Sequence, residues 1–208
     1  LNGVDIVLGA NDKFDLIKYL NETKVEMSTK VVRSDIDEVN SFKPSYSMDE
    51  RTRSYLKVQD GCDYTCSFCT IPLARGKSRS GTISDTIKAA KNIAESGNKE
   101  IVLTGVNIGD FGKRNDESFI DLMKELDSIN EINRIRISSI EPNLLTDEII
   151  EFCNFSKKFM PHFHIPLQSG SDKILKAIRR RYDKKVYQNR IRKIKDTNQD
   201  TCIGVDVI

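Results

Sequence analysis

The stretch YLKVQDGCDYTCSFC, residues 55–69, joins a short apolar strand to a loop that carries three cysteines. From this stretch onward the chain alternates between strand and helix patterns. Strands are predicted at 55–58, 101–103, 135–137, 163–165 and 203–208. Helices are predicted at 84–95, 118–128, 146–153, 171–180 and 184–196, and Ser84, Thr146 and Ser171 are the expected N-caps of three of them.

Five strands that alternate with helices indicate right-handed crossovers and a mainly parallel sheet, so the fold class is α/β. An open doubly wound sheet and a partial barrel both fit this alternation. In either architecture, ligands bind at the carboxyl ends of the strands. The polar residues that follow each predicted strand are therefore the candidate site.

Residues 1–47 have a different character, with predicted strands at 4–9 and 31–32 and a helix that Asp12 caps. Residues 34–50 are polar and serine-rich, which is typical of a linker. We interpret 1–47 as the tail of a preceding α/β domain and 48–208 as the main domain, which stops inside its fifth strand. The sequence begins without Met, so we expect a piece of a longer protein.

Composition excludes several classes of protein. The 208 residues are 38% hydrophobic and 31% charged, with 33 Lys or Arg against 31 Asp or Glu. No apolar run is long enough for a transmembrane helix, and the near-neutral net charge argues against a general polyanion binder. Three of the five cysteines lie within eight residues, which indicates a metal site in a reducing compartment, and no signal peptide is visible. We expect a cytoplasmic protein without a membrane partner.

The spacing C-x3-C-x2-C of Cys62, Cys66 and Cys69 allows two metal centres. Zinc needs four ligands, and the nearby sequence offers no fourth Cys or His. A cubane iron–sulfur cluster bound by three thiolates keeps one iron open for a substrate or cofactor. The open cluster is the better interpretation, and a zinc-stabilised RNA-binding module is the non-enzymatic alternative.

Four motifs together resemble the methylthiotransferase branch of the radical S-adenosylmethionine (SAM) enzymes. They are the cysteine loop with its continuation to Ser80, LTGVNIG at 103–109, SSIEP at 138–142 and HIPLQSGS at 164–171. The short RGKSRS segment at 75–80 and GVNIGDFG at 105–112 are most similar to the bacterial enzymes that modify N6-threonylcarbamoyladenosine (t6A) in tRNA. The branches that act on isopentenyladenosine or on a ribosomal protein remain alternatives.

The resemblance implies a partial (βα)6 barrel with a [4Fe-4S] cluster that binds and cleaves SAM. The resulting radical would activate C2 of t6A at position 37 of tRNA for addition of a methylthio group. A second [4Fe-4S] cluster, held outside this chain, would supply sulfur, and a reductase or flavodoxin-type protein would supply electrons. We therefore expect this piece alone to be inactive.

The resemblance also implies roles for single residues. Cys62, Cys66 and Cys69 would hold the cluster, Phe68 would lie against the SAM adenine, and Arg180 would pair with the SAM carboxylate. The other residues expected to contact SAM are Thr104, Gly105, Asn107, Ser138, Ser139, Glu141 and Gln168.

Two groups of basic residues are candidates for contact with tRNA phosphates. The first lies just after the cysteine loop and the second in the last predicted helix. Solvated helical surface explains them equally well. The candidates are Arg75, Lys77, Arg79, Lys184, Lys185 and Arg190, whereas we expect Arg179 and Arg181 to be solvated.

Overall fold

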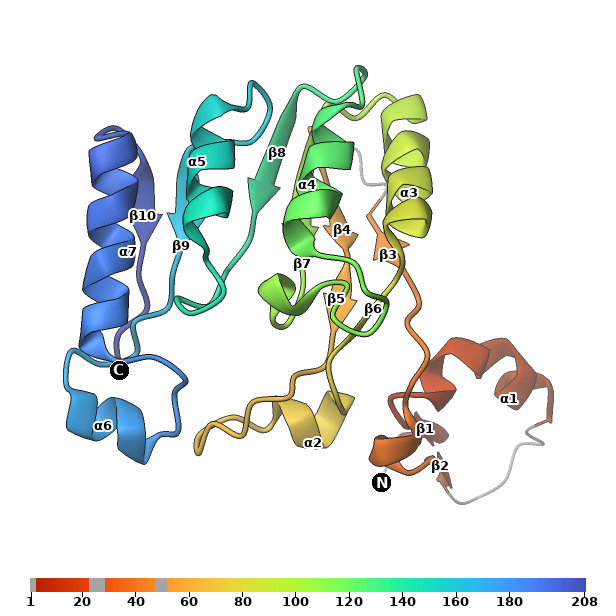
Figure 1. The fold of residues 1–208 in the computed structure, drawn as a ribbon. Coiled ribbons are helices and arrows are strands. Elements are labelled where there is room, and N and C mark those ends of the chain that lie inside the picture. Colours follow the sequence, from red (N-terminus) through yellow and green to blue (C-terminus); the bar gives the residue numbers. More distant parts are fainter. Residues whose placement is uncertain (1–2, 23–28, 48–51) are drawn as a thin grey trace.

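The computed structural model describes residues 3–22, 29–47 and 52–208. Its centre is a four-stranded sheet with the order β3-β4-β7-β8 (Figure 1). β4, β7 and β8 run parallel, and β3 pairs antiparallel with β4 at the edge. The bounds are Ser45–Tyr46 for β3, Arg53–Lys57 for β4, Glu100–Thr104 for β7 and Arg134–Ile137 for β8. The predicted domain start at residue 48 lies outside the described residues.

The last two strands, β9 (His162–His164) and β10 (Cys202–Gly204), form a separate parallel pair. β9 lies beside β8, where the Ile140 amide donates to the His164 carbonyl at 3.0 Å. The predicted α/β class with a mainly parallel sheet is confirmed. The described residues form a four-stranded open sheet and three separate pairs of strands, so a complete (βα)6 barrel is not seen among them.

Four helices lie in chain order along one side of the strands (Figure 1). Each buries an apolar stripe, which is the reason that these segments form stable helices. In α4, for example, Phe119, Leu122, Met123 and Leu126 are all buried in the core. The helices are α3 (Ile83–Glu95), α4 (Phe119–Asp127), α5 (Asp147–Phe155) and α7 (Lys184–Thr197). None of the described helices is long and apolar enough to cross a membrane.

The helix caps agree only in part with the sequence prediction. Thr146 caps α5 as predicted, since its hydroxyl accepts from the Ile149 amide. Ser84 is not the cap of α3. The extended residue before this helix is Thr82, whose hydroxyl accepts a hydrogen bond from the Asp85 backbone amide. Ser171 stands at the start of α6 but makes no side-chain capping bond.

The short elements gather at the end of the molecule where the parallel strands finish. An antiparallel pair, β5 (Gln59–Asp60) with β6 (Arg79–Ser80), flanks the cysteine loop and α2 (Ile71–Arg75). The helix predicted at 171–180 ends early, because Arg179 has a φ of 59° that a helix does not allow. The other short elements here are η3 (Ile108–Asp110) and α6 (Asp172–Ala177).

The N-terminal part has its own pair of parallel strands. The prediction that Asp12 caps a helix is wrong: its buried carboxylate accepts from the amide and hydroxyl of Ser34, both at 2.9 Å. The linker prediction is also wrong in part, because Ser45 and Tyr46 form β3 and extend the main sheet. The elements are β1 (Ile6–Leu8), η1 (Asp12–Asp15), α1 (Leu16–Glu22), β2 (Lys30–Val32) and η2 (Ile36–Glu38).

Candidate active site

The cysteine loop leaves the sheet directly after β4 and β5 and is fixed at its first residue. The Cys62 amide donates to the Gly76 carbonyl at 3.1 Å. Gly61 has a φ of 70°, and a Cβ at this position would lie 2.1 Å from the Lys77 carbonyl oxygen. Only glycine fits this close approach, so the segment 76–78 holds the start of the loop in place.

Two of the three cysteine sulfurs each accept one hydrogen bond. The Tyr64 amide donates to Cys62 Sγ at 3.4 Å, and Arg180 Nη1 donates to Cys66 Sγ at 3.5 Å. Burial raises the pKa of the Cys62 thiol to about 11. A metal that binds this sulfur therefore has to displace a proton. Positive and N–H donors close to the sulfurs favour the thiolate form that such binding requires.

Three cysteine thiols on one loop are a donor set that a cubane iron–sulfur cluster accepts, with one iron left open. Within residues 3–22, 29–47 and 52–208, no group of three His, Cys, Asp or Glu side chains is arranged around a point where a single ion could bind. Zinc requires such convergence of four ligands. In a cubane each thiolate binds a different iron, so its three cysteine ligands do not have to converge on one point.

Arg180 connects the loop to the strand ends. Its guanidinium, with a side chain only 6% exposed, forms an ion pair with Glu141 in addition to its contact with Cys66. Burial opposes the charge, but the hydrogen bond and the charge of Glu141 outweigh it and raise the pKa of Arg180. The structure thus brings two predicted SAM-contacting residues together beside a predicted cluster ligand.

The residues next to Arg180 also contact the loop. The Ser67 amide donates to the Ile178 carbonyl at 3.2 Å. Arg181 donates to the Asp63 carbonyl at 3.0 Å and lies 4.1 Å from the centroid of the Tyr64 ring. Arg181 is exposed, but it is not simply solvated as the sequence suggested. It makes a cation–π contact that holds the loop.

Gln59 joins the loop to the end of β7, and sequence analysis missed it. Its side chain is fully buried, and Nε2 donates to the Gly61 carbonyl at 2.7 Å and to Ser78 Oγ at 2.9 Å. Oε1 accepts from the Asn107 amide at 2.7 Å. A Cβ on Gly105 would lie 3.1 Å from the same Oε1, so this glycine allows close packing.

The side-chain amide oxygens of Asn107 and Asn143 indicate a site for a polar ligand. Asn107 Nδ2 donates to the buried Asp110, and Asn143 Nδ2 donates to the hydroxyl of Tyr64. The amide oxygens of both residues are buried, and no donor among the described residues reaches them. Buried acceptors without a donor are unusual, and a ligand amine or hydroxyl would satisfy them. A SAM molecule carries both kinds of group.

The ends of β8, β9 and β10 are linked through His164. Its Nδ1 lies 2.6 Å from Ser139 Oγ, and its Nε2 lies 3.2 Å from Asp206 Oδ1. Gln168 adopts a φ of 63°, and its amide donates to the Asp206 carbonyl. Ser138 and Ser139 are half-buried, and Thr104 ends β7. Phe68 is 48% exposed, so its ring is free to contact a ligand.

Three of the predicted RNA-contacting residues form ion pairs with carboxylates of this chain. Arg79 is 6% exposed and donates to Asp60 and to the carbonyls of Ser41, Arg75 and Lys77, so its guanidinium is already hydrogen-bonded within the chain. Arg75 pairs with Asp60, and Arg190 pairs with Asp147. Lys77, Lys184 and Lys185 are exposed and remain candidates.

Asp60 is a second residue that the sequence analysis missed. It is buried, and its carboxylate lies 3.0 Å from Arg75, 3.3 Å from Arg79 and 3.6 Å from Lys57. The signal in the sequence was the polar pair Gln59-Asp60 between an apolar strand and the first cysteine. Gln59 and Asp60 both hydrogen-bond to Gly61, directly before the first cysteine, and so hold the start of the loop.

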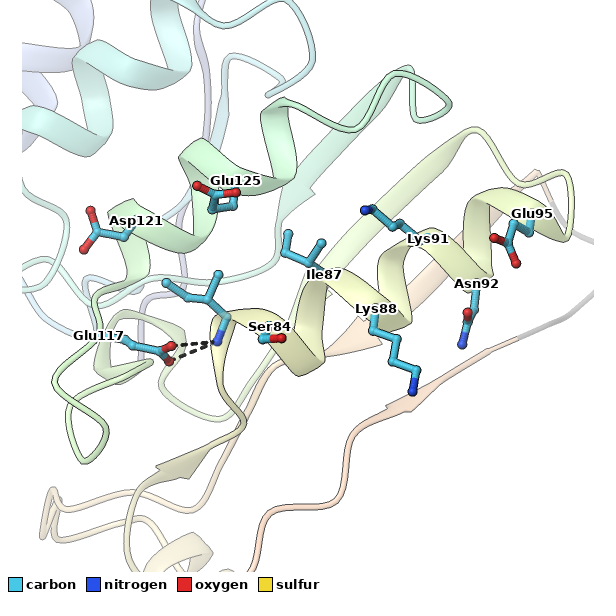
Figure 2. A pocket seen from close by; sticks show the side chains of 10 residues that line it. Ser84, Ile87, Lys88, Lys91, Asn92, Glu95, Glu117, Asp121 and Glu125 are labelled. Carbon is cyan, nitrogen blue, oxygen red and sulfur yellow. Dashed lines mark hydrogen bonds between the residues drawn. The ribbon is translucent and has the colours of Figure 1, made fainter.

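The groove between α3 and α4 is a separate feature. It has a volume of about 910 Å³, and side chains of both signs line it (Figure 2). The Glu117 carboxylate accepts from the Ile83 amide there and so satisfies the first turn of α3. None of the predicted site residues lines this groove.

Comparison with known proteins identifies the family. A family model described as the radical SAM superfamily matches residues 56–208. The chain belongs to the radical SAM superfamily. This confirms the resemblance to the radical SAM enzymes, and a zinc-stabilised RNA-binding module does not account for it.

Curated relatives show which kinds of radical SAM protein this chain is similar to. The threonylcarbamoyladenosine tRNA methylthiotransferase MtaB of Bacillus subtilis is 39% identical over 99% of this chain and 47% of its own length. The tRNA-2-methylthio-N(6)-dimethylallyladenosine synthase of Clostridium tetani is 32% identical over 99% of this chain and 46% of its own length. The chain therefore spans about half the length of the curated relatives it matches.

Solved structures support the fold. The cobalamin-dependent S-adenosylmethionine radical enzyme OxsB, solved with aqua-cobalamin and S-adenosylmethionine bound, matches with a TM-score of 0.66. It is 16% identical, and the match covers 95% of this chain and 32% of OxsB. At this low identity the match shows only that the strands and helices of the two proteins are arranged alike.

Proposed function

We propose that this chain is the SAM-binding part of a tRNA methylthiotransferase that adds a methylthio group to C2 of t6A at position 37. The observation that carries the proposal is 39% identity to a threonylcarbamoyladenosine tRNA methylthiotransferase over 99% of the chain. Four dimethylallyladenosine synthases are 32–34% identical to this chain, against 35–39% for four threonylcarbamoyladenosine enzymes. A tRNA substrate also favours a cytoplasmic location.

In this proposal Cys62, Cys66 and Cys69 would hold a [4Fe-4S] cluster, which would supply the one electron needed to break a C–S bond of SAM, with methionine as the other product. The residues of this chain bind and orient the cofactor. Asn107 and Asn143 offer buried acceptors, Arg180 offers the guanidinium for a carboxylate, and Phe68 offers an aromatic face. Thr104, Ser138, Ser139, Glu141 and Gln168 lie at the strand ends around them.

The division of the chain is part of the same proposal. Residues 1–47 are the end of a preceding domain, and 48–208 are the radical SAM core. The pair β1 and β2 makes its own small parallel sheet, separate from the main one. A second cluster, tRNA and a reductase or flavodoxin-type donor are the further partners that the whole enzyme requires.

The test of cluster binding is anaerobic reconstitution of the protein with iron and sulfide. We expect about four irons per chain and the broad absorption of a thiolate-bound cluster. Cys66→Ala should keep the fold and lose the iron. Stoichiometric zinc with no uptake of iron would overturn the assignment.

The test of the substrate is mass spectrometry of tRNA nucleosides from a strain that lacks the gene. We expect the 2-methylthio form of t6A to disappear and t6A itself to accumulate, and a plasmid copy should reverse both. Loss of methylthiolated isopentenyladenosine instead would favour the other branch.

A further inference from the structure

A cavity of about 580 Å³ opens beside the cysteine loop. Cys62 and Tyr64 form part of its wall, so a molecule bound there lies next to a proposed cluster ligand. Its lining combines apolar groups with charges of both signs. The remaining lining residues are Ile36, Asp37, Asp63, Thr65, Pro72, Leu73, Gly76, Lys77 and Arg114.

Two cations of the cavity lack an acidic partner. Lys77 and Arg114 are exposed, and neither lies within ion-pair distance of a carboxylate in the described part of the chain. Asp63 is already engaged, by Lys113 at 3.8 Å and by the Ser78 amide at 2.9 Å. Asp37 is an exposed carboxylate of the wall, and no cation within the described residues lies at ion-pair distance from it. Two cations and two carboxylates thus line the cavity, and Lys77 and Arg114 are cations that no ion pair within the described residues engages.

The backbone holds both cations near the loop. The Lys77 carbonyl packs against Gly61, directly before Cys62. Arg114 follows Gly112, whose amide donates to Ser80 Oγ at 3.0 Å, and Asn115 donates to the Gly81 carbonyl. The segments that carry Lys77 and Arg114 are thus both held against the β5–β6 pair and the residues next to it, beside the cysteines.

We infer that Lys77 and Arg114 bind a carboxylate of the substrate and thereby select an anionic group on the target adenosine over a neutral alkyl group. This inference rests on the proposed function. The threonylcarbamoyl group ends in the carboxylate of threonine, whereas the dimethylallyl group is a hydrocarbon. An arginine fork and an ammonium are suited to a carboxylate, and the apolar wall at Ile36, Pro72 and Leu73 can pack against the rest of the substituent.

The experiment uses the full-length reconstituted enzyme and anticodon stem-loop RNAs at one fixed salt concentration. One RNA carries t6A and the other carries its uncharged carboxamide analogue. We expect the wild-type enzyme to bind the t6A RNA about tenfold or more tightly, since hydrogen bonds to charged groups are the strong ones. The double variant Lys77→Gln/Arg114→Gln should bring the ratio of the two dissociation constants close to one.

The control removes the same charge elsewhere. Lys88 and Lys91 are exposed on α3 in the groove of Figure 2, so Lys88→Gln/Lys91→Gln should keep the wild-type ratio. Iron content and SAM affinity of each variant report that the fold and the cofactor site are intact. The single variants K77Q and R114Q replace the double variant if it fails to fold.

The outcomes separate this inference from the proposed function. If the wild-type enzyme prefers t6A and the cavity variants keep that preference, the inference is wrong and the proposed function stands. Equal binding of both RNAs by the wild-type enzyme also overturns the inference. If the wild-type enzyme binds neither RNA and tRNA from the deletion strain keeps methylthiolated t6A, both are wrong.

Discussion

At the scale of single residues, Asp60 illustrates how a buried charge supports the site. Burial alone would raise the pKa of Asp60, but the hydrogen bond from Arg75, the charge of Lys57 and the Gly61 amide lower it below its usual value. The carboxylate is therefore ionised at neutral pH. Its removal leaves Arg79 buried without its carboxylate partner.

We predict that Asp60→Asn destabilises the protein by about 3–5 kcal/mol, the usual cost of removing one partner of a buried ion pair. Chemical denaturation monitored by circular dichroism measures this free energy of unfolding. The matched control is Asp200→Asn, because Asp200 is exposed. Equal stability of the two variants would contradict the role assigned to Asp60.

Gly61 provides a second prediction at this scale. Gly61→Ala adds a methyl group that would lie 2.1 Å from a backbone oxygen, so the segment at Lys77 has to move. We expect lower iron uptake on reconstitution together with a lower melting temperature.

The control for Gly61→Ala is Gly97→Ala. Gly97 has a φ of 92°, but a Cβ there would meet nothing within 4 Å. This variant has the backbone strain of about 1 kcal/mol without the clash, so it should keep normal iron uptake. Reduced uptake in both variants would show that backbone strain alone accounts for the loss.

At the scale of the elements, the helices contribute to stability through one buried face. Leu122 of α4 is 0% exposed, whereas Phe155 at the end of α5 is 80% exposed. Both are large apolar residues in helices. The difference in burial predicts a difference in the cost of truncation.

Leu122→Ala should lower the free energy of unfolding by about 2–5 kcal/mol, because it removes buried methyl groups and leaves a cavity. Phe155→Ala should change it by less than about 0.5 kcal/mol. Urea denaturation of both variants provides the comparison. A large loss from Phe155→Ala would mean that another surface covers this residue in solution.

At the scale of the whole molecule, His162 makes stability depend on pH. Burial lowers the pKa of His162, and the charges of Arg136 and His164 lower it further, from an ordinary value of 6.5. The unfolded chain therefore takes up this proton at a higher pH than the folded protein. Acidification through pH 6.5 favours the unfolded state until the folded pKa is reached.

We predict that the free energy of unfolding falls between pH 7.5 and 5.5, and that His162→Gln makes this fall smaller. Denaturation of the wild type and of His162→Gln at both pH values measures how far the free energy of unfolding falls in each protein. Titrating groups other than His162 contribute equally to both falls and cancel when the two are compared. An identical pH dependence in the variant would refute the contribution of His162.

Local sequence determined much of this protein. Apolar stripes placed the helices α3, α4, α5 and α7 within a few residues, and short apolar runs placed the parallel strands, because these signals depend on neighbours along the chain. The cysteine spacing and the strand-end motifs identified the superfamily. These features require no knowledge of distant contacts.

Only the tertiary structure decided which polar residues work together. Gln59, Asp60 and Arg79 form one buried network, because Gln59 donates to the Asp60 carbonyl and Arg79 pairs with the Asp60 carboxylate. β3 extends the sheet from a segment that looked like a linker, and Arg180 contacts Glu141 and Cys66. The partners of Arg180 lie 39 and 114 residues away in sequence. A local sequence pattern cannot predict contacts between residues so far apart, because burial and pairing depend on how separate strands and loops are arranged in space.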